Sequence, residues 1–189
     1  DLEVLQWARQ NGCDWDEHTC DSAARGGHLE VLQWARQNGC PWNKWTCETA
    51  AERGHLEVLQ WARQNGCPWD EHTCASAARG GHLEILQWAR QNGCPWNKWT
   101  CASAADGGHL DVLQWARQNG CPWTSDTKKR VLDMIEANPT ASYYKAVRWF
   151  YENEDDFKTD KIRRLLDGID NVMYDVIGRD VSSIVQMYI

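Results

Sequence analysis

Apolar residues recur every three or four positions along the repeated part of the chain, which is the spacing of one face of a helix. In the segment from about Leu56 to Gln64 this face is formed by Leu56, Leu59 and Ala62, with Val58 and Trp61 beside them. Another short helix is predicted before it, from Asn43 through Ala50 and Ala51 to about Gly54. The pattern therefore predicts pairs of short helices.

Residues with strong end preferences mark where these helices start and stop. Asn43 stands where an N-cap is expected, and the same place is filled in the other copies by Asp16, Asp70, Asn97 and Thr124. Trp42 before the cap and Cys47 inside the helix fit a hydrophobic staple. Gly66 suits a left-handed turn after the second helix, and Pro68 prevents its continuation.

The helix pair is repeated along the chain with a fixed period. One unit reads GHLEVLQWARQNGCPWDEHTCASAARG, and its central tryptophan recurs every 27 residues at Trp7, Trp34, Trp61, Trp88 and Trp115. One pair cannot bury its apolar stripe alone, whereas stacked copies can. The sequence therefore predicts an all-α solenoid of helix-turn-helix repeats followed by C-terminal helices.

The segment AAERGHLEVLQWARQNGC resembles the helix-turn-helix of ankyrin repeats, and the resemblance covers residues 1–123. Two features depart from that family. The period is 27 residues rather than about 33, so most of the β-hairpin finger is missing, and the family's TPLH is replaced by WTCE or HTCA. The short, Trp-rich form is similar to ankyrin variants of protists, algae and large DNA viruses.

The repeats suggest three regions. Residues 1–123 form the repeats, and the first copy is partial because Asp1 aligns with His28, so we expect further repeats upstream. Residues 124–153 are predicted to be a degenerate capping repeat, in which VRWFYEN resembles LQWARQN and Trp149 takes the repeat's tryptophan position. Residues 154–189 carry one amphipathic helical stripe, which either packs back on the solenoid or docks on a partner.

Cysteine and histidine recur together, for example as Cys13, Cys20 and His28. Structural zinc sites normally show closer cysteine pairs, and each of these residues already has a structural place in the repeat, so no cofactor or metal is predicted. Buried cysteines on helices are also poorly placed for disulfides. We interpret the nine cysteines as reduced thiols, and hence expect an intracellular, reducing compartment, with the cytoplasm first and an organelle as the alternative.

Net charge and motifs exclude several classes of function. The formal net charge of −7 argues against a nucleic-acid backbone as partner. No run of about eighteen apolar residues predicts a membrane span. No phosphate-binding glycine loop, HExxH or GxSxG motif is present, so we do not expect an enzyme.

The copies differ mainly in the loop and the first helix, where the sequence alternates with a period of two repeats. The ankyrin resemblance implies that this loop and helix face contacts a partner, whereas free drift of exposed positions is the alternative. The predicted contacts there are Asp16, His18, Asp21, Lys44, Trp45, Glu48, Asp70, His72, Lys98 and Trp99. Those in the C-terminal stripe are Ile169, Met173, Ile177 and Ile184.

These observations favour a scaffold that binds a protein partner through the solenoid face, and also through the C-terminal helix if that helix docks. The first alternative is a structural subunit of a stable assembly, anchored by the C-terminal helix. A zinc or redox protein is the more distant alternative.

Overall fold

The fold is described from a computed structural model, which places residues 1–137, 141–160, 162–164 and 166–168. These residues belong to two compact units, 1–134 and 135–189, and each unit is described by itself. Every regular element in the described ranges is helical. The predicted contacts Ile169, Met173, Ile177 and Ile184 lie outside the described residues.

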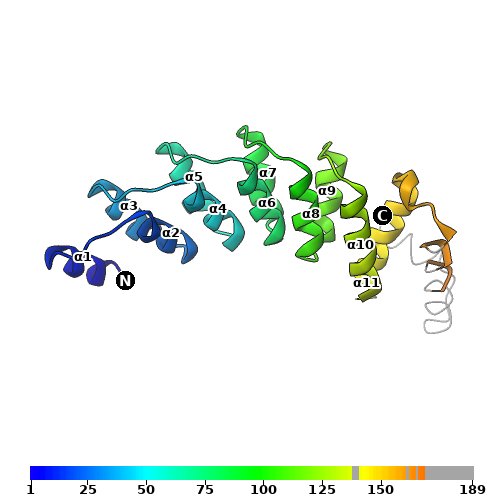
Figure 1. The fold of residues 1–189 in the computed structure, drawn as a ribbon, viewed down its shortest axis with the longest axis horizontal. Coiled ribbons are helices and arrows are strands. Elements are labelled where there is room, and N and C mark those ends of the chain that lie inside the picture. Colours follow the sequence, from blue (N-terminus) through cyan, green and yellow to red (C-terminus); the bar gives the residue numbers. More distant parts are fainter. Residues whose placement is uncertain (138–140, 161, 165, 169–189) are drawn as a thin grey trace, which may run out of the picture. The chain divides into compact units, whose positions relative to one another are not determined.

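The first unit is a solenoid of helix pairs arranged in two rows (Figure 1). In one row, α2, α4, α6 and α8 each pack against the next, and in the other row α3, α5, α7 and α9 each pack against the helix before it in the chain. Contacts therefore join only neighbouring repeats, as in other solenoids. The bounds are α1 Leu2–Gln10, α2 Glu17–Arg25, α3 Leu29–Gln37, α4 Lys44–Arg53, α5 Leu56–Gln64, α6 Glu71–Arg79, α7 Leu83–Gln91, α8 Lys98–Asp106, α9 Leu110–Gln118 and α10 Ser125–Ala137.

The predicted N-caps are confirmed in the first row. The side chains of Asp16, Asn43, Asp70 and Asn97 each accept a hydrogen bond from the backbone N–H two residues further on. These bonds are 2.8–3.0 Å long. Each satisfies a backbone donor that the first turn leaves without a helical partner, which is why the helices begin where the sequence predicts.

The second helix of each pair ends in a Schellman turn. Gly66 has a φ of +84°, as predicted for a left-handed position. The N–H of Gly66 donates to the Arg63 carbonyl at 3.1 Å, and the N–H of Cys67 donates to the Ala62 carbonyl at 2.9 Å. These two bonds cap the last carbonyls and turn the chain into the loop before the next repeat.

The loop between successive helix pairs is held by an arginine and two tryptophans. The Arg36 guanidinium lies over the Trp42 ring at 4.2 Å, and the same side chain donates a hydrogen bond to the Cys40 carbonyl. Trp42 also packs edge-to-face on Trp61 of the next helix pair, with ring centroids 5.8 Å apart. Sequence reasoning had given Trp42 the role of a staple with Cys47; the structure shows these two partners, and such aromatic and cation–π contacts stabilise the loop.

The buried face of the second helix is narrower than the sequence pattern suggests. Leu59 and Ala62 are fully buried and Val58 nearly so, whereas Leu56 and Trp61 remain partly exposed.

Eight of the nine cysteines are buried and all nine are free thiols. Four of the buried thiols donate to the backbone carbonyl of the N-cap residue that begins the first helix of their pair: Cys40, Cys67 and Cys94 at 3.3 Å, and Cys121 at 3.6 Å. Burial raises the pKa of the Cys20 thiol. The cysteines thus act as small core residues, and those in the loops also join the loop to the start of the first helix of the pair.

The second unit contains α11 Ala141–Asn153 and the short 3₁₀ helix η1 Asp155–Phe157. Phe150 stacks on Phe157 with ring centroids 5.2 Å apart, and both side chains are buried. The Asn153 side-chain amide donates to the Trp149 carbonyl at 2.9 Å, as Asn38 does to Trp34 in the repeats. This shared bond supports the resemblance between VRWFYEN and LQWARQN.

Helix α1 differs from its equivalents in the later repeats. Leu32 and Ala35 of α3 are fully buried, whereas no residue of α1 is buried and Val4 and Trp7 are more than 60% exposed. Helices α3, α5, α7 and α9 each pack against the helix before them in the chain, which helps to bury their apolar side chains.

Candidate functional site

The exposed side of α2, α4, α6 and α8, called here the α2–α8 face, carries most of the predicted contact residues. On α2, His18, Ser22 and Arg25 are four and three positions apart, so their side chains lie on one side of the helix. Together with Trp45 and Thr49 of α4 they line a hollow between the two helices.

A second hollow repeats the first at a distance of two repeats along the chain. It lies between α6 and α8 and is lined by His72, Ser76, Arg79, Trp99 and Ser103. Each of these positions is 54 residues after its counterpart in the first hollow, and the residue type is the same except for Ser103, which corresponds to Thr49. Sequence reasoning missed Ser22 and Ser76. Their spacing from the predicted histidines, one helical turn, is the signal that could have found them.

Each hollow presents a half-exposed indole. Trp45 is 49% exposed and Trp99 is 51% exposed. The His18 ring stacks on Trp45 with centroids 6.4 Å apart, and the Lys98 ammonium lies 5.3 Å from the Trp99 ring centroid. Half-exposed tryptophans beside charged side chains are typical of residues that dominate protein interfaces.

Asp21 lies on the same helix and lines the same hollow, but most of its side chain is buried. Only 11% of its side chain is exposed, and its carboxylate accepts a hydrogen bond from the Thr46 hydroxyl at 2.7 Å. Burial raises the pKa of this carboxyl group, against the effect of the Thr46 hydrogen bond. The Asp21 side chain therefore joins α2 to α4 at the edge of the hollow, and its role as a contact residue stays a prediction.

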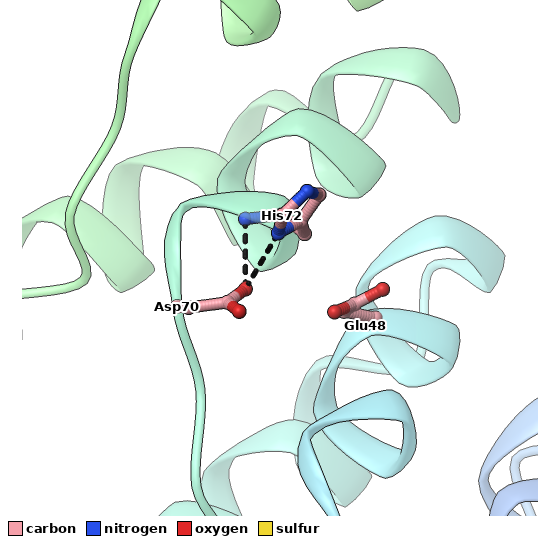
Figure 2. Close-up of side chains that lie close together, drawn as sticks. All are labelled: Glu48, Asp70 and His72. Atoms are coloured by element: carbon pink, nitrogen blue, oxygen red, sulfur yellow. Dashed lines mark hydrogen bonds and ion pairs between the residues drawn. The ribbon is translucent and has the colours of Figure 1, made fainter.

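Glu48, Asp70 and His72 form a polar cluster where α4 meets the start of α6 (Figure 2). Asp70 accepts hydrogen bonds from the backbone N–H of His72 at 3.0 Å and from its ring at 3.1 Å. The Lys44 ammonium lies 2.6 Å from one Asp70 oxygen and 3.9 Å from Glu48. The cluster therefore joins two neighbouring repeats through charge.

The two acids of this cluster respond differently to their surroundings. Burial, and then the nearby Asp70 charge, raises the pKa of Glu48. Partial burial acts the same way on Asp70, but the hydrogen bonds from Lys44 and His72 outweigh it and lower the pKa of Asp70. One Glu48 oxygen is buried without a hydrogen bond, so Glu48 is the less satisfied of the two.

One ligand atom from each of Glu48, Asp70 and His72 lies within 4.8 Å of the others, a set that could in principle hold a divalent cation. Lys44 already supplies a positive charge to both carboxylates. The arrangement is therefore that of an ion-pair network. The equivalent positions in the flanking interfaces carry Asp21, Asn43 and Trp45, or Ala75, Asn97 and Trp99, so this network is specific to one interface.

The recurrent cysteines and histidines serve the stack. The ring nitrogen of His55 lies 3.2 Å from the Arg25 carbonyl, and that of His82 lies 3.0 Å from the Glu52 carbonyl. Among the described residues, the groupings of potential metal ligands include no cysteine. None of the helices in the described ranges combines the length and hydropathy that a membrane span requires.

The fold defines the class of protein as a helical-repeat solenoid, and comparison with known families gives the kind of repeat. A family model for ankyrin repeats (many copies) matches residues 20–63 and again residues 47–90, two matches offset by one 27-residue period. A search of curated proteins found no match. Residues 20–90 therefore consist of ankyrin repeats, and these are of the short, 27-residue form.

Proposed function

We propose that the α2–α8 face binds a protein partner, with Trp45 and Trp99 as the main anchors. Ankyrin repeats are in general protein–protein interaction modules. The observation that carries the proposal is the pair of half-exposed indoles in two equivalent hollows. Tryptophan in a hollow can bury a large apolar area while its N–H finds a polar partner.

The remaining surface of the first unit supports this choice of face. Of the large hydrophobic residues that are exposed in the described ranges, Trp45 and Trp99 lie on the α2–α8 face, and Val4 and Trp7 lie on α1. Charged side chains flank both indoles. A centre that is aromatic with a charged rim is the usual composition of a transient protein interface.

Replacing both anchors by alanine tests the proposal. The immobilised chain captures proteins from an extract of the source cells, and the captured proteins are quantified by mass spectrometry. We expect Trp45→Ala and Trp99→Ala each to weaken capture of the specific partner about 30-fold, and together about 1,000-fold, because anchor residues contribute roughly 2 kcal/mol each.

Trp7→Ala is the matched control, because Trp7 is an exposed tryptophan on another part of the solenoid. Circular dichroism checks that all variants fold. Undiminished capture by the double variant would contradict the proposal. Loss of capture after deletion of 157–189, with the solenoid still folded, would instead support the structural-subunit alternative.

A further inference from the structure

The charges of the α2–α8 face change sign from each repeat to the next. At the start of the four helices the residues are Glu17, Lys44, Glu71 and Lys98. At the end of the same helices they are Arg25, Glu52, Arg79 and Asp106. Between them, an imidazole alternates with an indole at His18, Trp45, His72 and Trp99.

Residues 1–133 do not neutralise the two central charges of the helix-end row. Arg79 is exposed and Glu52 is half-buried, and no ion pair in residues 1–133 involves either side chain. Asp106 differs, because Arg130 forms an ion pair with it at 2.7 Å. The free charges at the centre of the face are therefore Glu52 and Arg79, on adjacent helices about 10 Å apart.

A row of four charges with alternating signs is complementary to a second copy of the same row that runs in the opposite direction. When two copies of the face meet about a two-fold axis parallel to the helices, the second repeat of one copy lies opposite the third repeat of the other. Glu52 then meets Arg79 of the second copy, and Lys44 meets Glu71 of the second copy, and symmetry repeats each pair. Arg25 and Glu17 likewise meet Asp106 and Lys98 of the second copy.

We propose that two copies of this chain associate in antiparallel fashion through the α2–α8 face. This inference rests on the proposed function, because it uses the same face and specifies the partner as a second copy. The aromatic row supports the antiparallel arrangement, since it places Trp45 opposite His72 of the second copy and Trp99 opposite His18. Indole and imidazole already stack in this way within one chain, at His18 and Trp45.

A parallel arrangement is the competing geometry. With the two-fold axis along the stack, helix starts would meet helix ends, so Arg79 would lie opposite Glu71 of the second copy. The charges would still be complementary, but each indole would face the helix-end row instead of an imidazole. The two arrangements therefore predict different partners for Arg79.

Charge exchange between two variants tests the proposal. We expect the purified full chain to sediment as a dimer in analytical ultracentrifugation, more weakly at high salt. Arg79→Glu and Glu52→Arg should each weaken the dimer about 100-fold, because each places two like-charge pairs at the centre. An equimolar mixture of the two variants should restore dimerisation, since the opposite charges meet again.

The restored mixture also shows that both variants fold. Glu57→Arg, an exposed position on α5 in the other row, is the matched control and should leave the dimer unchanged. Rescue of Arg79→Glu by Glu71→Lys and not by Glu52→Arg would overturn the antiparallel arrangement. A wild-type chain that stays monomeric at all concentrations would overturn the inference as a whole.

The outcome is separable from that of the proposed function. A monomeric chain that still captures a different protein through Trp45 and Trp99 would overturn self-association and leave the proposed face standing. The opposite result is a dimer that charge exchange weakens, together with capture of other proteins that the Trp45→Ala and Trp99→Ala substitutions do not change. That result would support self-association and contradict the binding of a different protein through the two tryptophans.

Discussion

At the scale of single residues, one helix position shows how the repeats have diverged. The position is occupied by Asp21, Glu48, Ala75 and Ala102 in successive copies. The Asp21 carboxylate accepts a hydrogen bond from the Thr46 hydroxyl, whereas the equivalent hydroxyls of Thr73 and Thr100 are buried without a hydrogen-bond partner. An acid at this position thus satisfies a buried threonine in one interface, but Glu48 does not do so in the next.

We expect Glu48→Gln to make the protein more stable at neutral pH. The pKa of Glu48 is raised in the folded chain, mainly by burial, so the ionised carboxylate disfavours folding at pH 7. As the pH falls through the raised pKa, the carboxylate takes up its proton and the wild type gains stability. Below the ordinary value of 4.5, both folded and unfolded chains are protonated and the advantage of glutamine is lost.

Urea unfolding followed by circular dichroism between pH 4 and pH 8 measures this difference. The exposed Glu57→Gln substitution is the control and should change the free energy of unfolding by less than about 0.5 kcal/mol. A Glu48→Gln variant that is less stable than the wild type at pH 7 would show that the Lys44 ion pair outweighs the burial of the carboxylate.

At the scale of the helix pair, two glycines distinguish the requirements of the local turn from those of the contacts between repeats. Gly54 and Gly66 have the same φ of +84°, one after the first helix of a pair and one after the second. A Cβ at Gly66 would meet nothing within 4 Å, whereas a Cβ at Gly54 would lie 2.7 Å from the His82 ring of the next repeat. The first glycine is thus required by the turn and by the stack, and the second by the turn alone.

We expect Gly66→Ala to cost about 1–2 kcal/mol, the penalty for a left-handed alanine. Gly54→Ala should cost at least about 1 kcal/mol more, because the His82 ring has to move and it lies 3.0 Å from the Glu52 carbonyl. Chemical denaturation of the two variants side by side measures the difference. Equal losses would indicate that the ring moves aside freely.

Much of the helix pair could be predicted from sequence. The caps, the left-handed glycine and the helix bounds depend on residues within a few positions of each other, so their signals are local. The partners of Trp42 could not be predicted in the same way. They are Arg36 in α3 and Trp61 in α5, the second helix of the following pair, and their approach depends on how two repeats stack.

At the scale of the whole molecule, the stack decides which thiols meet solvent. Cys13 is exposed and the other eight cysteines are buried. In the native protein we expect a thiol reagent to modify Cys13 rapidly and the others only as the stack opens, because burial removes access and raises the pKa of thiols such as Cys20. All nine should react after unfolding.

Peptide mapping by mass spectrometry identifies the modified residue, and Cys13→Ser is the control that should abolish the fast phase. Rapid modification of several cysteines in the folded protein would show that the repeats open locally. Such opening is expected first at the ends of a solenoid, where each repeat has a neighbour on one side only.

The sequence by itself determined the 27-residue period, the helices, their caps and the ankyrin resemblance, because these depend on local chemistry that is repeated in each copy. Only the tertiary structure decided which side chains meet across repeats. It buried Asp21 against Thr46, 25 residues away, and left Trp45 and Trp99 half-exposed in two equivalent hollows. The physical reason is that burial at each position depends on residues one repeat away, which stacking alone brings together.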